Sequence, residues 1–252
     1  MCASRKGRDR TGMFLAEGVR TVAELVAWNP GSIDALLVNS DSRQAPAVAQ
    51  LIEAAEMAEV ACEMLASDQY EAIAETQTSQ GVVALARQQH IRVSELLAKD
   101  PQFLVVSDNI QDPGNLGALI RIADAVGADS FVASQGSADL HNPKTVRAAM
   151  GSLFHLTHSK GASIQEICAA LSNAGIELIA ADAGGATSYL DVKYRRPLAV
   201  VFGNEGAGIT PDVLRFATRV NIPMPGTAES LNVAVAAGVM LYEILRQWRG
   251  TD

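Results

Sequence analysis

The sequence has few cysteines, no long apolar run and no excess of basic residues. Its three cysteines, Cys2, Cys62 and Cys168, are widely spaced and form no CxxC pair. This pattern favours reduced thiols over a disulfide framework or a zinc site. No apolar run approaches the roughly 18 residues of a membrane-spanning helix, and none of the signal-peptide type follows the basic opening "MCASRKGRDRTG". We therefore expect a cytoplasmic protein with no metal centre and no membrane partner.

The formal net charge of −8 at pH 7 is unusual for a protein whose ligand is a polyanion. The charge is unevenly distributed, however. Residues 1–20 carry five basic and two acidic side chains, a local balance of +3, and smaller basic groups occur at 144–147 and 193–196. Each cluster is also compatible with an ordinary solvated surface. Charge alone therefore identifies no partner.

A hydrophobic content of 48% with 19% charged residues is typical of a folded globular protein. The first part of the chain reads as a small α/β domain over 1–92, followed by a linker at 93–101. Within it we expect helices over 13–28 and 45–58, and strands over 33–40, 58–65 and 80–88.

From residue 102 to residue 252, strand and helix patterns alternate more clearly. The expected strands are 103–108, 130–134, 176–182, 198–203 and 219–224, and the expected helices are 115–128, 142–152, 163–175 and 230–248. Such alternation predicts a mainly parallel sheet covered by helices on both faces.

A glycine-rich loop follows one of these strands in "LAVVFGNEGAGITPD", residues 198–212. A dinucleotide-binding fold would instead carry GxGxxG after its first strand. Here the order is Gly203-x-x-Gly206-x-Gly208, near the end of the chain, and no GxxxxGK[ST] phosphate loop occurs. A standard dehydrogenase is therefore not expected, and a P-loop enzyme is excluded.

Three stretches together resemble the ordered motifs of the SpoU, or TrmH-type, branch of the SPOUT RNA methyltransferases. They are 108–128, "DNIQDPGNLGALIRIADAVGA"; the glycine loop; and 221–245, "NIPMPGTAESLNVAVAAGVMLYEIL". The matching positions are Asn115, Gly117 and Arg121; Gly203, Glu205 and Gly206; and Ile222, Pro223, Met224, Gly226, Ser230, Leu231 and Asn232. "FLAEGVRTV" resembles the start of the family's substrate-binding domain, and "NPKTVRAAMGSLFHL" a segment between the motifs.

The chemistry of single residues agrees with this resemblance. At 100° per residue, Arg121 lies opposite the apolar stripe of its helix, so it points to solvent, a ligand or a partner chain. Asn115 could be a helix cap, and Ser230 would by default cap the last helix. Glu205 stands between glycines, where we expect it to orient an arginine or an amide. The last helix is apolar on most sides, which predicts burial against the domain or a second subunit.

The resemblance implies an S-adenosylmethionine-dependent transfer of a methyl group to a ribose 2′-hydroxyl of RNA, most simply 23S-type rRNA. It implies catalytic roles for Asn115, Arg121, Glu205, Ser230 and Asn232, and cofactor contacts for Gly203, Asn204, Gly206, Ile222, Met224 and Leu231. It implies RNA contacts for Arg8, Arg10, Glu17 and Arg147. It also implies a deep C-terminal trefoil knot and a homodimer formed through the C-terminal domain.

Other functions stay open at this point. The target could be tRNA, and the enzyme could be of the antibiotic-resistance type. The chain could also be a non-catalytic RNA-binding or ribosome-assembly factor, or a small-molecule enzyme that binds an adenine cofactor. None of the four histidines falls in a motif, and we interpret them as structural or surface residues.

Overall fold

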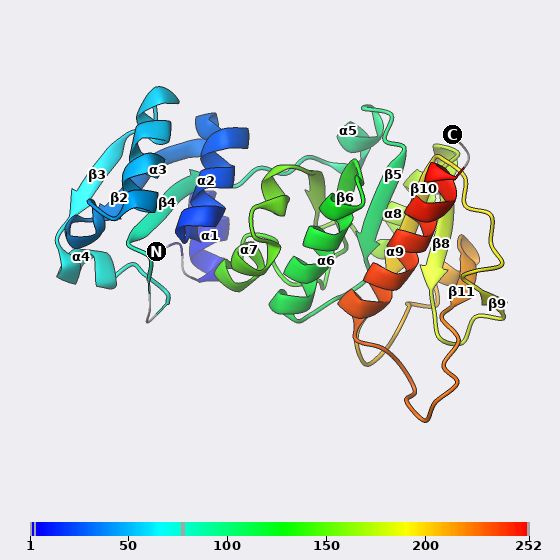
Figure 1. The fold of residues 1–252 in the computed structure, drawn as a ribbon. Helices are drawn as coiled ribbons and strands as arrows, with labels where there is room; N and C mark the ends of the chain where they lie inside the picture. Colours follow the sequence, from blue (N-terminus) through cyan, green and yellow to red (C-terminus); the bar gives the residue numbers. More distant parts are fainter. Residues whose placement is uncertain (1, 3, 77–78, 251–252) are drawn as a thin grey trace. The chain divides into compact units, whose positions relative to one another are not determined.

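The computed structural model describes residues 2, 4–76 and 79–250 of the chain (Figure 1). They form two compact units. Unit 1 consists of residues 1–89 together with 139–155, and unit 2 consists of 90–138 together with 156–252. The chain therefore leaves unit 1, returns to it once, and leaves it again.

Unit 1 is built on a four-stranded sheet with the order β1-β4-β2-β3. β4 is antiparallel to both β1 and β2, whereas β2 and β3 are parallel. The strands are β1 (Met13–Glu17), β2 (Ile33–Asn39), β3 (Cys62–Leu65) and β4 (Val82–Arg87). The helices are α1 (Arg5–Thr11), α2 (Val19–Trp28), α3 (Pro46–Met57), α4 (Ser67–Glu71) and α7 (Pro143–Ala149).

The helix expected over 13–28 is wrong in its first part. Met13–Glu17 is strand β1, with alternating buried and half-buried side chains, and it pairs along its length with β4. Gly18 then adopts φ +96°, which separates the strand from α2. The apolar residues of 13–28 fit a helical spacing, but pairing with β4 satisfies the backbone of the first five residues.

Residues 139–155 pack in unit 1, although the sequence places them in the second domain. The guanidinium of Arg8 lies 2.8 Å from the Asp139 carboxylate, and both side chains are almost fully shielded from water. The rings of Phe14 and His141 pack with centroids 4.7 Å apart. These contacts join segments about 130 positions apart, so the local sequence pattern carries no sign of them.

Unit 2 contains a seven-stranded sheet in which every neighbouring pair is parallel, as the alternation predicts. The spatial order is β7-β6-β5-β10-β8-β11-β9. The strands are β5 (Phe103–Ser107), β6 (Ser130–Ala133), β7 (Thr157–Lys160), β8 (Glu177–Ala181), β9 (Thr187–Ser188), β10 (Leu198–Phe202) and β11 (Thr218–Asn221).

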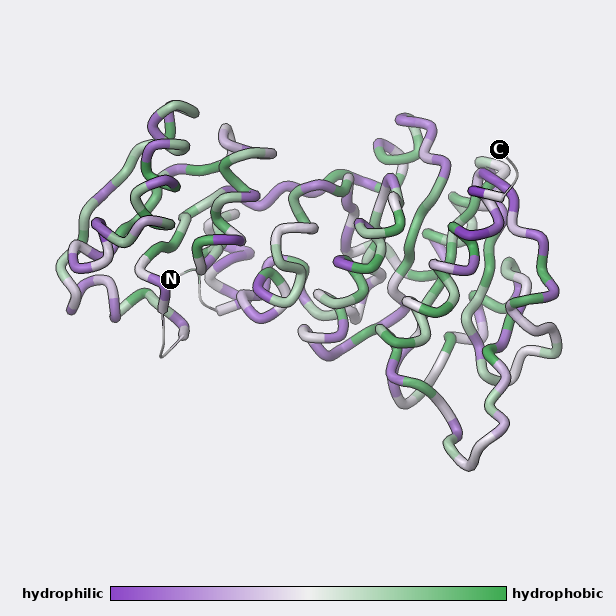
Figure 2. Tube along the Cα trace, viewed as in Figure 1, coloured by the Kyte–Doolittle hydropathy of each residue, from purple (hydrophilic) through white to green (hydrophobic). Residues whose placement is uncertain are grey.

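Helices cover both faces of this sheet. Figure 1 shows α6 (Pro113–Ala125) and α9 (Val233–Arg249) in front of it and α8 (Ile164–Asn173) behind. All residues of β5 and β10 are buried, which explains their continuous apolar runs (Figure 2). The predicted α/β architecture is confirmed.

The stretch expected as a linker contains a helix. Residues Val93–Leu97 form α5, where Glu95 accepts a hydrogen bond from the backbone nitrogen of Arg92 at 2.9 Å. Leu96 is fully buried in the core of unit 2, in the same cluster as residues of α8. The segment is thus part of unit 2, because one apolar side chain anchors it.

The strand order creates a switch point beside β5. The chain proceeds from β5 to β6 and β7 on one side, and then places β8 and β10 on the other side. Loops leaving the carboxyl ends of the strands diverge at such a point, which is where open α/β sheets bind their ligands.

Candidate active site

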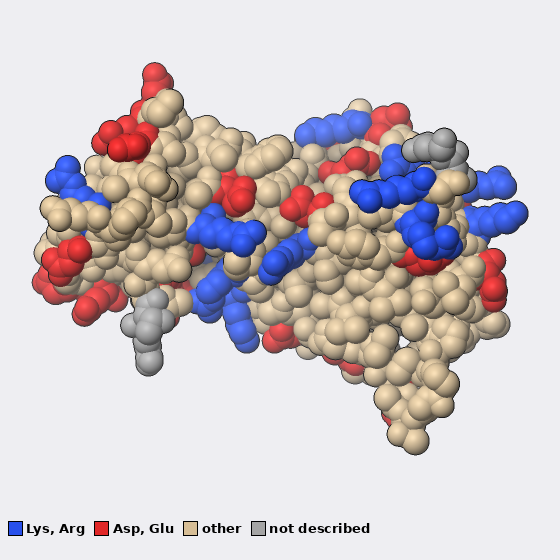
Figure 3. Space-filling view, viewed as in Figure 1, with Lys and Arg blue, Asp and Glu red and all other residues tan. Residues whose placement is uncertain are grey.

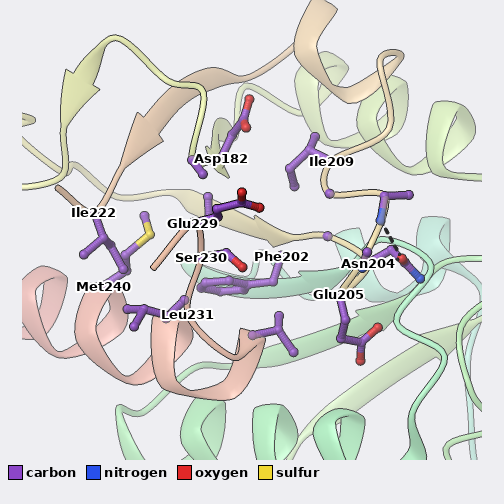
Figure 4. Close-up of a pocket in the computed structure, with 18 of the residues that line it drawn as sticks. Asp182, Phe202, Asn204, Glu205, Ile209, Ile222, Glu229, Ser230, Leu231 and Met240 are labelled. Carbon is purple, nitrogen blue, oxygen red and sulfur yellow. Dashed lines mark hydrogen bonds between the residues drawn. The ribbon is translucent and has the colours of Figure 1, made fainter. Parts of the chain in front are cut away.

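A cavity of about 360 Å³ lies at the carboxyl ends of β8, β10 and β11 and against the first half of α9 (Figure 4). This volume falls in the range of small-molecule sites. Figure 4 shows Ile222, Leu231 and Met240 gathered at one end of the cavity and Glu205 at the other. The remaining lining residues are Ala181, Asp182, Ala183, Phe202, Gly203, Asn204, Gly206, Ala207, Gly208, Ile209, Val220, Met224, Glu229, Ser230, Val233 and Ala236.

The glycine loop of this cavity folds back on itself. Asn204 pairs with Gly208 through two backbone hydrogen bonds of 3.0 and 2.9 Å. The Oδ1 atom of Asn204 accepts from the backbone nitrogens of Gly206 and Ala207, both at 2.9 Å. Its Nδ2 atom donates to the carbonyl oxygen of Asn109 at 2.9 Å. The Asn204 side chain therefore shapes the loop that lines the cavity.

Gly203 is required by this close folding. A Cβ atom at that position would lie 2.4 Å from the carbonyl oxygen of Gly208. Gly208 itself has φ +70°, a conformation that favours glycine. The two glycines thus permit the turn, whatever ligand the loop contacts.

Asp108, which sequence reasoning missed, anchors the far side of the loop. Its carboxylate accepts from the Thr210 backbone nitrogen at 2.7 Å and from the Thr210 hydroxyl at 2.9 Å. Asp108 is buried at the end of β5. An acidic residue directly after a fully apolar strand was the available signal, because a buried carboxylate needs partners.

Three of the residues proposed as catalytic are joined by hydrogen bonds. The side-chain nitrogen of Asn115 donates to Glu205 Oε1 at 2.9 Å. The side-chain nitrogen of Asn232 donates to Asn115 Oδ1 at 3.0 Å. The chain Asn232–Asn115–Glu205 therefore connects one residue from each of the three sequence motifs.

The helix caps differ from the sequence expectation. Asp112, and not Asn115, caps α6 by accepting from the Asn115 backbone nitrogen at 2.8 Å. Asn232, and not Ser230, caps α9 by accepting from Ala234 N at 3.0 Å. The Asn115 side chain is therefore free of a capping role, and Ser230 is an exposed residue of the cavity wall.

Arg121 is separated from this group. It is exposed on α6, six residues beyond Asn115, or about 9 Å along the helix axis. It points away from the buried side of α6, as its helical position predicts, but it is not among the described residues that line the cavity. The structure does not bring it together with Glu205 and Ser230.

The cavity wall is acidic. Asp182, Glu205 and Glu229 line it, and no Lys or Arg occurs among the lining residues that the structure describes. Asp182 is held from outside by Arg219, whose Nε lies 2.7 Å from its carboxylate. Carboxylates in this arrangement favour a ligand that carries positive charge.

The residues proposed to contact RNA lie in different environments. Arg10 and Arg147 are exposed. Arg8 is buried in its ion pair with Asp139, so it stabilises unit 1 and is not placed to contact a phosphate. Figure 3 shows Lys and Arg side chains gathered over the part of unit 1 where Figure 1 draws α1 and α7.

The Glu17 carboxylate is hydrogen-bonded to the segment that precedes β4. It accepts hydrogen bonds from the Glu75 backbone nitrogen and from the Thr76 hydroxyl. Burial, and then the neighbouring Glu17 carboxylate, raise the pKa of Glu75, while Arg8 and Arg147 lower it. Glu17 therefore orders this segment next to the basic residues of α1 and α7.

Within the described ranges there is no group of three or more His, Cys, Asp or Glu side chains arranged to hold a metal ion. No helix among those residues has both the length and the apolar character needed to cross a membrane.

Comparison with known proteins now identifies the family. The SpoU rRNA Methylase family model matches residues 102–242, and the MRM3-like substrate binding domain matches residues 2–84. The chain belongs to the SpoU rRNA methylase family. This SpoU protein is 34% identical over 243 residues to the 23S rRNA (guanosine(2553)-2′-O)-methyltransferase RlmP of Bacillus subtilis, covering 96% of this chain and 92% of the relative.

Two further relatives span both units of the SpoU chain. The 23S rRNA (uridine(2479)-2′-O)-methyltransferase of Streptomyces viridochromogenes is 30% identical, covering 98% of this chain and 87% of the relative. The crystal structure of the SpoU methyltransferase AviRb from the same organism, in complex with AdoMet, matches with a TM-score of 0.85 and 29% identity, covering 99% and 96% of the two chains.

Proposed function

We propose that this SpoU protein methylates a ribose 2′-hydroxyl of RNA, with 23S-type rRNA as the substrate and S-adenosylmethionine as the methyl donor. The observation that carries the proposal is the hydrogen-bonded chain Asn232–Asn115–Glu205 beside a cavity of small-molecule size. The similarity to 23S rRNA 2′-O-methyltransferases over nearly the whole chain supports the same conclusion.

The cavity suits S-adenosylmethionine in both polarity and charge. Its apolar end, formed by Ile222, Leu231 and Met240, suits an adenine ring, and its carboxylates suit the cationic amino and sulfonium groups. We propose that Gly203, Asn204, Gly206, Ile222, Met224 and Leu231 hold the cofactor. The bound cofactor supplies a methyl group that its sulfonium charge has already activated, so the protein needs chiefly to orient an acceptor oxygen and handle its proton.

We propose that different polar residues at the cavity orient and activate the acceptor oxygen. Glu205 fixes the Asn115 amide, and Asn115 in turn fixes Asn232. We assign to the two amides the orientation of the ribose, and to the exposed Ser230 hydroxyl a hydrogen bond to it. Positioned dipoles of this kind stabilise the charge that develops on an attacking oxygen.

Arg121 would act as an electrostatic group. A guanidinium stays charged in proteins, so we assign Arg121 to RNA phosphate binding and to stabilising developing alkoxide charge. Because Arg121 lies outside the cavity of its own chain, we propose that it serves the site of a second subunit.

We also propose a homodimer formed through α9, which its exposed apolar stripe supports. Val235, Val239 and Tyr242 recur at i, i+4 and i+7 on α9 and are 53%, 36% and 54% exposed. Such a stripe costs free energy in water unless a partner covers it. The trefoil knot stays a prediction. With rRNA as the substrate, we also expect a cytoplasmic location.

The RNA would bind through α1 and α7. Five exposed basic residues from these helices, Arg5, Lys6, Arg10, Lys144 and Arg147, form a basic surface despite the net charge of −8. Phosphate contacts of this kind weaken steeply with salt. Charge reversal at Arg10 and Arg147 should reduce RNA affinity and flatten its salt dependence.

The reaction is tested with labelled S-adenosylmethionine and separate pools of unmodified rRNA and tRNA. Alkaline hydrolysis follows, because 2′-O-methylation protects the adjacent phosphodiester bond. Label in alkali-resistant dinucleotides from rRNA is the expected result. Label in dinucleotides from tRNA would move the substrate to tRNA. Label in mononucleotides would mean base methylation and would overturn the reaction, and bound cofactor without transfer would favour a non-catalytic RNA-binding factor.

A further inference from the structure

An exposed tryptophan in unit 1 is not explained by the fold. Trp28, at the last position of α2, is 60% exposed. The other tryptophan of the chain, Trp248, packs edge-on against Phe103 at 4.7 Å and donates its indole N–H to the Tyr194 carbonyl at 3.0 Å. Large apolar side chains are normally buried in this way. The exposed indole of Trp28 therefore calls for another explanation.

The indole is held in a defined position. Its ring packs against the His155 imidazole, with centroids 4.7 Å apart and planes at 46°. His155 Nε2 lies 3.2 Å from a Glu24 carboxylate oxygen. Next to them, the Asn29 side chain donates to the Phe154 carbonyl at 3.0 Å. Three contacts thus fix two adjacent rings before any ligand arrives, which lowers the entropy cost of binding.

The surroundings of Trp28 are charged. Arg20, Glu24 and Trp28 follow each other at intervals of four, so they lie on one stripe of α2. An apolar groove between α2 and α3 is lined on the α2 side by Val19, Ala23, Val26 and Ala27. These residues are about 100–180° around the helix from Trp28 at 100° per residue. Trp28 itself is not among the residues that line this groove.

We propose that Trp28 and His155 form a stacking platform for an unpaired base of the RNA substrate, with Arg20 contacting the adjoining phosphate. The proposal rests on the proposed function, since it requires an RNA ligand. An aromatic face next to a guanidinium is the usual means of binding single-stranded nucleic acid, because every base offers a π-face. The platform would increase the affinity for RNA and fix the position of the strand, with little preference for the identity of the stacked base.

Binding to polyuridylate, an unstacked single strand, tests the platform. Trp28→Ala should weaken binding about tenfold, in line with the loss of one base–aromatic stack, and should leave the salt dependence unchanged. Trp28→Phe should retain most of the affinity. Arg20→Ala should lower both the affinity and the salt dependence. Phe216→Ala, which removes another partly exposed aromatic ring, in unit 2, serves as the matched control and should have no effect.

Tryptophan fluorescence gives a second readout that does not depend on affinity. In a Trp248→Phe background Trp28 is the sole tryptophan, and polyuridylate should quench its emission. Unchanged affinity of Trp28→Ala together with unquenched emission would overturn the platform while leaving the methyltransferase proposal intact. Failure of the wild-type protein to bind any RNA would overturn both. Equal loss of affinity in Trp28→Phe and Trp28→Ala would mean that the indole has only a structural role.

Discussion

Arg8 and Asp139 form a buried ion pair that joins α1 to the segment leading into α7. Their side chains are 2% and 5% exposed, and two guanidinium nitrogens lie 2.8 Å from the same carboxylate oxygen. The pair fixes the helix that carries Arg5, Lys6 and Arg10 next to the helix that carries Arg147. A basic surface made from two distant parts of the sequence thus depends on a basic residue that the solvent does not reach.

Removing one member of this pair should destabilise unit 1. Arg8→Met leaves the Asp139 carboxylate buried without its guanidinium, and breaking a buried pair in this way costs about 3–5 kcal/mol of the free energy of unfolding. Urea denaturation measures it. Arg5→Met is the control, because the Arg5–Asp9 pair is exposed and its loss should cost about 1 kcal/mol or less. A small effect of Arg8→Met would mean that the buried pair is not important for stability.

Gly203→Ala should damage both stability and cofactor binding. The new Cβ would lie 2.4 Å from the Gly208 carbonyl oxygen, so the loop must shift, at a cost of about 1–3 kcal/mol. Gly206→Ala is the matched variant, since its Cβ meets only Asn204 Oδ1 at 3.7 Å. Thermal unfolding and calorimetric titration with S-adenosylmethionine should separate the two, and equal behaviour would contradict the loop geometry.

Asn115 and Asn232 should act as one unit in catalysis. Asn115→Ala and Asn232→Ala should each lower kcat about 100-fold, the usual cost of losing a positioned hydrogen-bond donor. The double variant should lose little more, because each amide orients the other. Single-turnover methylation with saturating cofactor measures this coupling. Multiplicative losses would show that the two amides act independently.

The Cys168 thiol should make the protein less stable at alkaline pH. Burial, and then the nearby Asp108 and Asp212, raise the pKa of Cys168 from 9.0 to about 12. The folded state therefore keeps a proton that the unfolded chain loses above about pH 9. The free energy of unfolding should fall over pH 9–12 by up to about 1.4 kcal/mol per pH unit.

Cys168→Ala tests this dependence through the slope of the free energy of unfolding against pH. The variant should be less stable overall, but its stability should fall less between pH 9 and pH 11 than that of the wild type. At pH 8, iodoacetamide should modify Cys168 of the folded protein only as fast as the protein unfolds. Fast modification of folded Cys168 would show that it is not buried.

The stripe on α9 should control the oligomeric state. Val239→Glu places a charge in the centre of the proposed interface and should convert a dimer to a monomer in light scattering. Leu190→Glu alters another exposed apolar residue of unit 2 and should leave the mass unchanged. If the subunits share sites, mixing Arg121→Ala with Asn232→Ala should restore part of the activity. A wild-type monomer would contradict the dimer.

Periodicity predicted strands β5, β6, β8 and β10 of unit 2 because they are short and mainly apolar. It failed where tertiary contacts decide the structure. Met13–Glu17 has apolar residues at spacings that fit a helix, yet β4 lies beside it and makes it a strand. The segment at 93–101 resembles a linker that ends at Pro101, yet Val93–Leu97 forms a helix with Leu96 buried in the core of unit 2.

The sequence predicted which residues belong to the candidate site, but not the hydrogen bonds that join them. The motifs contain Asn115, Glu205 and Asn232. No spacing in the sequence indicates that these three residues form a hydrogen-bonded chain. The sequence analysis also predicted an RNA contact for Arg8, which the burial of this side chain does not allow. Exposure of an arginine depends on partners far away in the chain, and here that partner is Asp139.

The return of residues 139–155 to unit 1 also sets an order of events during synthesis. The chain is complete to the end of β4 long before α7 exists, and residues 90–155 take roughly 3–13 s to translate at 5–20 residues per second. Until residue 139 has been made, Arg8 has no Asp139 to bind. The first unit to emerge from the ribosome therefore cannot complete its folding first, because its last segment is made only after residues 90–138 of the second unit.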